Sequence, residues 1–216
     1  MPKIPACDVL VVGGDNCPDF PSTADRRVAE GPLIADQREW FLNTYVPWVK
    51  RQNVEQTLLT WGNHDYLGTK QGLAFDREFS AALKSARMRV VVDTVAFACG
   101  RSFFLTPWSV SWRDWAFTKS DLELAMYYSL FKLPPVDVVV AHQPPYGVCD
   151  LDRSGDHYGS HALLEYVEQT QPTALVCGHV HNGRGVGEVD KTTVYNVAIL
   201  DDTYHPVYEP VMIEIP

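Results

Sequence analysis

Two histidines, His179 and His181, lie one residue apart directly after a short apolar stretch of the chain. Residues 173–177, with the sequence TALVC, are typical of a buried strand, and Gly178 allows the sharp turn that ends it. The two imidazole rings are therefore expected on a loop at the carboxyl end of a strand, the edge of an open α/β sheet where ligands bind. Taken alone, the pair is also compatible with two exposed loop histidines.

Three other apolar stretches also end in side chains that can bind metal ions. Residues 8–14 (DVLVVGG) precede Asp15, residues 56–61 (QTLLTW) precede the sequence GNHD, and residues 136–141 (VDVVVA) precede His142. Each motif has an ordinary alternative, such as a turn aspartate, a helix cap or a rigid proline turn. Four such strand ends together favour a single site at one sheet edge. Its candidate residues are Asp15, Asn63, His64, His142, His179 and His181.

The types of donor atom indicate which ion such a site prefers. One carboxylate, one amide oxygen and several imidazoles suit Mn, Fe or Zn, whereas Mg and Ca prefer shells made of oxygen alone. A carboxylate can also bridge two ions, and two ions about 3.5–4 Å apart form the clamp used for in-line displacement at phosphorus. Asp15 is the natural bridge, so the pattern predicts metal-assisted hydrolysis of a phosphoester.

Alternating strands and helices are predicted to position these side chains. Helices are expected at residues 35–52, 75–86, 120–131 and 160–170, and further strands at 89–98, 102–105, 192–200 and 206–215. Pro47 is expected to kink the first helix. Because helices and strands alternate before strands accumulate, the pattern favours an α/β sandwich with some antiparallel pairing. No linker or repeat divides the chain, which is predicted to form a single domain over residues 1–216.

The composition argues against several classes of protein. The formal net charge of −9 and the isoelectric point near 5.2 disfavour non-specific binding to a nucleic-acid backbone, which needs clustered Lys and Arg. Five cysteines without a C-x-x-C spacing predict neither a disulfide framework nor a structural zinc site. The sequence has no long apolar run and no charged-then-apolar leader, so we expect no membrane span and a cytoplasmic protein.

Taken together, the motifs resemble those of the calcineurin-like metallophosphoesterases. Gly-Asp at 14–15, GNHD at 62–65, His142 before two prolines and GHVH at 178–181 stand in the family's order. The chain is similar to a small stand-alone branch of that family, because it carries PWSVSWRDWAF at 107–117 and AHQPPYGVCD at 141–150. The resemblance runs over nearly the whole chain. It implies an αββα sandwich of two mixed sheets flanked by helices.

The resemblance also implies a role for each candidate residue. The implied metal ligands are Asp15, Asn63, His142, His179 and His181. Asp15 would bridge two divalent ions, His181 would serve the first, and the other three ligands would complete the second site. His64 would protonate the leaving oxygen or stabilise the charged transition state. A full-length protein of this kind is expected to hold two ions, Mn, Fe or Zn.

One feature of the family has no counterpart in this sequence. Members open with a strand that ends in D-x-H and supplies two ligands to the first metal, whereas no histidine precedes His64 here. Only seven residues precede Asp8, so the first strand of the sandwich is expected to be missing. Three explanations compete: an upstream D-x-H segment outside a misassigned or truncated start, an enzyme that works with one metal ion, or a non-catalytic relative that binds a phosphorylated ligand or a partner protein. We rank them in that order, because a pure binding module has no need of His64 as a proton donor.

The substrate is expected to be a small phosphoester or a nucleotide, since the acidic charge makes a nucleic acid unfavourable. Phosphomonoesters and phosphodiesters both fit the predicted reaction. Trp108, Trp112 and Trp115 could line a substrate cleft, although a tryptophan cluster is more often part of a core.

Four further polar features have less specific interpretations. Asp19 could orient His64, Asn16 could contact phosphate, and Asn196 could face the site. The acidic loop at residues 150–157 is expected to be solvated, although it could approach the substrate.

Overall fold

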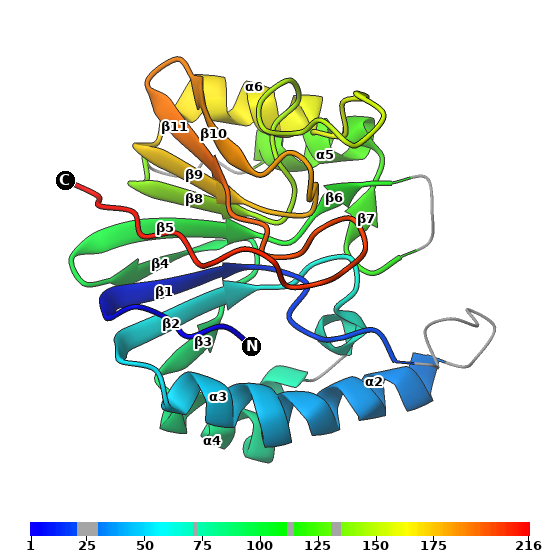
Figure 1. The fold of residues 1–216 in the computed structure, drawn as a ribbon, viewed down its shortest axis with the longest axis vertical. Coiled ribbons are helices and arrows are strands. Elements are labelled where there is room, and N and C mark those ends of the chain that lie inside the picture. The colour runs from blue at the N-terminus through cyan, green and yellow to red at the C-terminus, as the bar shows by residue number, and fades with distance from the viewer. Residues whose placement is uncertain (21–29, 71–72, 112–114, 131–134) are drawn as a thin grey trace.

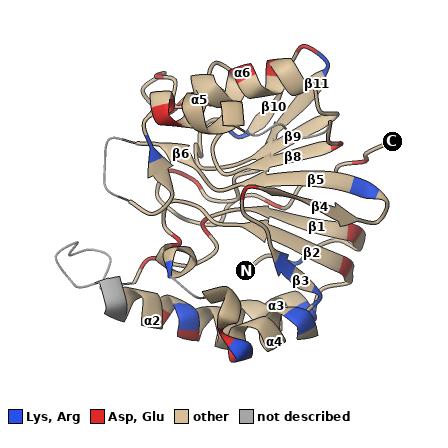
Figure 2. Ribbon diagram, turned by 180° about the vertical axis from the view of Figure 1, so that it is seen from behind, with Lys and Arg blue, Asp and Glu red and all other residues tan. Residues whose placement is uncertain are grey.

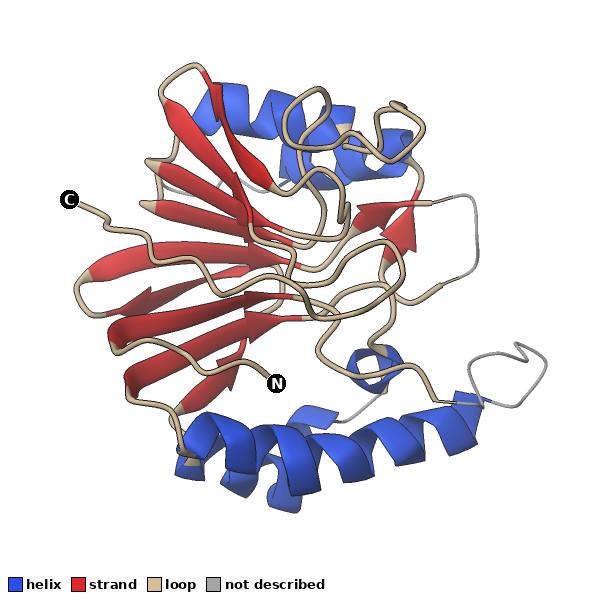
Figure 3. Ribbon diagram, viewed as in Figure 1, coloured by secondary structure: helices blue, strands red, loops and turns tan. Residues whose placement is uncertain are grey.

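The fold is a sandwich of two β-sheets between two layers of helices (Figure 1 and Figure 3). The computed structural model describes residues 1–20, 30–70, 73–111, 115–130 and 135–216. Helices α2 to α4 lie on one side of the strands, and α5 and α6 lie on the opposite side (Figure 1). This arrangement confirms the αββα sandwich that the resemblance implied.

The first sheet is parallel and comes from the amino-terminal part of the chain. Its strands, in spatial order, are β1 (Cys7–Gly13), β2 (Val54–Thr60) and β3 (Met88–Val90). The helices of this half are α2 (Glu30–Trp40), α3 (Val46–Lys50) and α4 (Arg77–Ser85), with 3₁₀ turns at Tyr66–Thr69 and Leu73–Phe75. Gly13 pairs with Thr60, so β1 and β2 end together at one edge.

The second sheet has six strands and is mixed. In spatial order they are β10 (Gly185–Val189), β11 (Thr192–Asn196), β9 (Ala174–Cys177), β8 (Val138–Ala141), β5 (Arg101–Thr106) and β4 (Thr94–Ala98). The two outer pairs are antiparallel and the inner strands are parallel. Helices α5 (Asp121–Leu130) and α6 (His161–Thr170) cover this sheet, and β6 (Ser109–Val110) pairs with β7 (Thr118–Lys119).

Three apolar clusters fill the spaces between the four layers. Leu58 and Leu59 are both fully buried, but Leu58 packs between the sheets while Leu59 packs under the helices of the first half. On β8, Val138 and Val140 face the first sheet, whereas Val139 faces α5 and α6. Successive side chains of a strand point to opposite faces, so a strand covered on both faces reads as a continuous apolar run.

The chain changes sheets at residues 91–93. The sequence predicts one strand over residues 89–98, but β3 ends at Val90 and β4 begins at Thr94 in the other sheet. Asp93 has a φ of +50°, and its carboxylate accepts hydrogen bonds from Thr106, Trp108 and Tyr127. These contacts with distant residues stabilise the interruption between β3 and β4. The local pattern of β-branched residues does not predict this interruption.

The helix that contains Pro47 widens before the proline. Residues Phe41–Tyr45 form a π-helical turn, and Pro47 lies in the first turn of α3 directly after it. Proline lacks an N–H and clashes with the carbonyl four residues earlier. The wider turn relieves this clash, so the kink that was predicted takes the form of a π-turn.

The carboxyl-terminal segment is extended but forms none of the sheet strands. Strands are predicted to residue 200 and over residues 206–215, yet the last strand of the structure ends at Asn196. Prolines at 206, 210 and 216 cannot donate to a sheet ladder. This explains why the alternation of apolar residues over residues 206–215 does not produce a strand. Ile213 and Ile215 still pack against the cluster between the sheets.

The strand β1 is apolar, but it lies at the edge of its sheet. Among the described residues β1 pairs with β2 alone. A cavity of about 790 Å³ runs along its other edge, between the inner face of the second sheet at Phe103, Val138 and Val176 and the segment at residues 210–215. The backbone donors and acceptors on this edge therefore have no strand partner there.

Candidate metal centre

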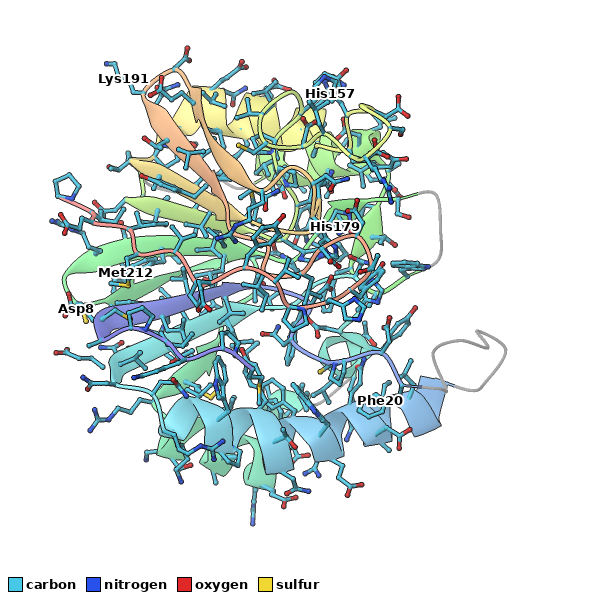
Figure 4. All side chains as sticks on the ribbon, viewed as in Figure 1. Asp8, Phe20, His157, His179, Lys191 and Met212 are labelled. Atoms are coloured by element: carbon cyan, nitrogen blue, oxygen red, sulfur yellow. The ribbon has the colours of Figure 1, made fainter. Side chains whose placement is uncertain are left out.

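Loops after four strands meet at one end of the sandwich and bring four predicted ligands together. These ligands are Asp15 after β1, Asn63 after β2, His142 after β8 and His179 after β9. Metal-binding atoms of Asp15, His142 and His179 all lie within 4.8 Å of one another. His142 Nε2 lies 2.8 Å from Asn63 Oδ1 and 3.5 Å from Asp15 Oδ2. Figure 4 shows His179 among the loops at this end of the strands.

The ring of His142 determines which chemistry the cluster can do. Its Nδ1 lies 2.9 Å from the carbonyl oxygen of Gly13, which can only accept, so Nδ1 carries the proton. In the neutral ring Nε2 then holds a lone pair, and it faces the acceptor atoms of Asn63 and Asp15. A metal-ligating histidine commonly binds a carbonyl through its other ring nitrogen, which fixes the ring in this way.

A divalent cation fits the donor set. Buried acceptor atoms that converge without a donor between them carry an uncompensated desolvation cost, and a cation removes it. The amide of Asn63 is also buried, and its Nδ2 has no hydrogen-bond partner among the described residues. The protein alone therefore does not satisfy these groups. Two imidazoles, a carboxylate and an amide oxygen suit an ion of the Mn, Fe or Zn type.

His179 is held neutral and ready to act as a ligand. Burial, together with the neighbouring ring of His142, lowers the pKa of His179 to about 3. The two ring centroids lie 4.8 Å apart in an edge-to-face arrangement. His179 also has a φ of +64°, a backbone conformation that a non-glycine residue adopts only when its surroundings impose it.

Two glycines allow the loop of Asp15 to approach its neighbours. A Cβ atom on Gly14, which has a φ of +106°, would lie 2.6 Å from the carbonyl oxygen of Trp61. A Cβ on Gly62 would collide with the carboxylate of Asp15 and the ring of His142. Burial alone would raise the pKa of Asp15, but His142, His64 and the hydrogen bond from the His64 backbone N–H outweigh it and hold that pKa below its usual value. The carboxylate is thus ionised and available to a cation.

Asp65, the last residue of GNHD, fastens two of the ligand loops to each other. Its buried carboxylate accepts hydrogen bonds from the backbone N–H groups of Asn16, Cys17 and Gly62 at 3.1, 2.9 and 2.8 Å. No prediction from sequence gave Asp65 a role. The signal was present, since Asp65 directly follows Asn63 and His64, but two of its three partners, Asn16 and Cys17, are 49 and 48 residues away in sequence.

His64 lies beside the ligand cluster and outside it. Its Nδ1 lies 2.8 Å from Asp19 Oδ1, which confirms that Asp19 contacts and orients the ring. Trp115 packs edge-on against this ring, with the two ring centroids 4.6 Å apart. Burial would lower the pKa of His64, but the hydrogen bond to Asp19 and the charge of Asp15 raise it above its usual value. A raised pKa favours the protonated form of the ring, which a proton donor needs.

His181 is not part of the group of mutually close ligand atoms. Among the described residues, that group contains Asp15, His142 and His179. His181 Nδ1 lies 2.8 Å from the carbonyl oxygen of Asp201 and must donate to it, so the neutral ring keeps a lone pair on Nε2. His181 and His179 line a common cavity of about 210 Å³. The structure therefore places His181 beside the centre without joining it to the other ligands.

Asn16 and Asn196 have structural roles. Asn16 is buried, donates to the carbonyl oxygen of Thr60 at 2.7 Å and accepts from the hydroxyl of Tyr45. Asn196 donates to the carbonyl oxygens of Cys149 and Val180, and so holds the loop between the two histidines of GHVH. Their polar atoms are used inside the protein and do not point to a ligand.

The acidic loop after Pro145 contains one buried aspartate, contrary to the expectation of a solvated loop. Asp150 is 1% exposed and accepts hydrogen bonds from the N–H groups of Gly147 and Gly159. It also lies 2.7 Å from His157 Nδ1.

Trp108 donates to Asp93, while Trp112 lies outside the described residues.

The fold and the centre define the class of protein. The family model described as calcineurin-like phosphoesterase matches residues 2–183, and the chain belongs to the calcineurin-like phosphoesterase family. No helix among the described residues is both long and apolar enough to cross a membrane.

Particular relatives are found in animals. The chain is 30% identical over 128 residues to the Homo sapiens protein named metallophosphoesterase domain-containing protein 1, an alignment that covers 57% of this chain and 39% of that protein. The chain thus spans less than half of that relative's length. A UPF0046 protein of Caenorhabditis elegans is 25% identical over 233 residues, covering 100% of this chain and 75% of that protein. A solved crystal structure aligns with a TM-score of 0.60 over 88% of this chain and 79% of the other at 19% identity, and shows the fold.

Replacing Asp65 with Ala is expected to destabilise the metal-free protein by about 3 kcal/mol or more, because orphaned buried donors each cost about 1–3 kcal/mol. Urea-induced unfolding measures this loss. Asp8→Ala, which removes an exposed carboxylate from β1, is the matched control. Equal stability of the two variants would contradict the role of Asp65.

Replacing Asp19 with Asn is expected to lower the pKa of His64, because the hydrogen bond to the carboxylate and its charge both raise that pKa. The measurement is an NMR titration of the His64 ring in the metal-free protein. Asp8→Asn controls for the loss of one negative charge. A pKa that does not change in Asp19→Asn would overturn the pairing.

Proposed function

We propose that this chain hydrolyses a small phosphomonoester or phosphodiester, a small metabolite or a nucleotide, with the help of a divalent cation. Asp15, Asn63, His142 and His179 would hold the cation. The observation that carries the proposal is the convergence of acceptor atoms around His142 Nε2. Membership of a phosphoesterase family supports the same reaction. We favour manganese, iron or zinc, since imidazoles contribute half of the donors.

The residues around the centre divide the work of the reaction. A bound divalent ion would neutralise charge on phosphoryl oxygens and make water a stronger nucleophile. His142 is aimed by Gly13, and Asp15 is kept ionised by the surrounding histidines. His64, held by Asp19, donates its proton to the leaving oxygen, and Trp115 packs against the same ring and limits its rotation. General acid catalysis of this kind contributes roughly 10²–10⁴-fold to the rate.

A small substrate suits the centre better than a nucleic acid does. The chain carries a net charge of −9, and the cavity at His179 and His181 also includes Asp152 and Asp202. Negative charge near the centre repels the polyanionic backbone of a nucleic acid beyond the reacting phosphate. We also propose a cytoplasmic location, which the five free cysteines support.

We propose further that one more strand, ending in D-x-H, pairs with the free edge of β1 and completes a centre for two ions. The support is the cavity of about 790 Å³ along this edge, lined by apolar side chains of both sheets. A strand parallel to β1 would end beside Asp15, which would then bridge the ions. His181, with a free lone pair on Nε2, would bind the ion of the first site.

His64→Ala is expected to keep metal affinity and lose about 10²–10⁴-fold in kcat, because it removes the proton donor alone. His142→Ala is expected to lose metal affinity by about 100-fold or more as well. Isothermal titration with Mn²⁺ and turnover of bis-p-nitrophenyl phosphate separate the two effects. His161→Ala, an exposed histidine of α6, is the control.

Equal metal retention in the His64 and His142 variants would contradict these assignments. A parent chain without turnover that binds inorganic phosphate equally well before and after His64→Ala would favour a non-catalytic phosphate-binding protein.

Reading the source DNA upstream of the Met1 codon is expected to reveal an in-frame coding segment whose translated sequence predicts a strand that ends in D-x-H. The protein that includes it is expected to hold two Mn²⁺ ions per chain where this chain holds one, because the added Asp and His complete the first site. Elemental analysis of the purified proteins provides the count. An in-frame stop codon immediately upstream would refute the added strand and favour a one-metal centre.

A further inference from the structure

A large groove lies between α4 and β3, and it contains none of the predicted metal ligands. Its volume is about 1220 Å³. Its floor is apolar, because Trp61, Phe79 and Met88 are buried there and Leu83 and Val90 are half-buried. A concave apolar surface of this size is typical of a binding site for another molecule.

The rim of the groove is positively charged. Lys70, Lys84, Arg87 and Arg89 line it and are exposed, whereas Glu55 is the one acidic side chain among the described residues that line it. Figure 2 shows basic positions on β3 and along the helices beside it. The chain as a whole has a net charge of −9, so the groove has the opposite sign to the molecule. Such a patch attracts and orients an acidic partner.

None of the four cations forms an ion pair among the described residues, although the charge of Lys70 acts on Asp76. Among the described residues, the ion pairs of Lys and Arg involve Arg38 and none of the four rim side chains. Arg89 Nη1 donates to the carbonyl oxygen of Phe97 at 3.1 Å, which fixes its direction without neutralising its charge. Their charge therefore remains available to a ligand.

The backbone holds one of these cations in an unfavourable conformation. Arg87 follows α4 with a φ of +52°, a region that glycine occupies at lower cost. Its N–H bonds to the carbonyl oxygen of Lys84, so the turn after α4 is well formed. Arginine at this position has a conformational cost that glycine, the usual residue after a helix, would avoid.

We propose that this groove binds an acidic peptide segment of a partner protein, with apolar side chains on the floor and Asp or Glu side chains against the rim. The free outer edge of β3 can also pair with an extended peptide backbone, since among the described residues β3 pairs with β2 alone. Phe75 is 88% exposed next to the rim residue Ala74, which adds an aromatic contact for a partner.

A peptide fits the groove better than a nucleic acid does. Single-stranded nucleic acids are bound by exposed aromatic faces on which bases stack. Trp61 and Phe79 are each 2% exposed and cannot offer such a face, and Phe75 is a single exposed ring where successive bases need several. The accessible apolar side chains of the groove, Leu83, Val90 and Val92, instead match aliphatic or aromatic side chains of a peptide.

The test is fluorescence anisotropy with three labelled peptides that share the same Leu and Phe positions and carry Glu, Gln or Lys at all others. We expect the Glu peptide to bind, the Gln peptide to bind about tenfold more weakly and the Lys peptide not to bind. The double variant Lys84→Glu with Arg87→Glu is expected to weaken binding of the Glu peptide by about tenfold or more.

The double variant Lys50→Glu with Arg51→Glu reverses two charges at the end of α3 and is the matched control, expected to stay within about twofold of the parent. Circular dichroism and thermal melting establish that each variant is folded. Equal losses in both double variants, no preference for Glu over Lys, or tighter binding of a single-stranded oligonucleotide would overturn the proposal. The readout does not involve phosphoester hydrolysis, so it is independent of the proposed function.

Discussion

The hydrogen bond from His142 Nδ1 to the carbonyl oxygen of Gly13 is the interaction on which the centre depends. It joins the end of β8 in the second sheet to the end of β1 in the first. It fixes the proton on Nδ1 and so leaves Nε2 as an acceptor that faces Asn63 and Asp15. Gly14 and Gly62 make the approach possible, because any side chain at either position would occupy the space of this ring.

Around this contact, hydrogen bonds from buried polar residues position the ligands. Asp65 connects the loop of Asp15 to the loop of Asn63, and Asn196 holds the loop that carries His179. Asp15 and His179 both have left-handed backbone angles, with φ of +52° and +64°, a conformation that Asp and His adopt more often than most non-glycine residues. Hydrogen bonds within the protein therefore hold the loops that carry these side chains.

The layers, and the meeting of Asp15, Asn63, His142 and His179 at one edge, were largely predictable from sequence, since both depend on local patterns. Apolar runs that end in glycine, Asp or His mark strand ends, and the ends of parallel strands meet at one edge. The remaining features depend on distant contacts. Asp65 and Asn196 act through partners in other loops, and Asp93 breaks a continuous apolar pattern with side chains of β5 and α5. His181 is close to His179 in sequence, yet its ring is directed by Asp201, which no local pattern reveals.

The two sheets come from separate halves of the chain, since residues 7–90 supply every strand of the first and residues 94–196 every strand of the second. Asp15 and Asn63 belong to one half, and His142 and His179 belong to the other. Neither half alone contains the centre, so it exists only after the halves have docked. An ion that takes ligands from both halves would bind the docked form more tightly and would shift the docking equilibrium by mass action. An ion at the centre would thus link the two halves during folding, and its binding would indicate that they have docked.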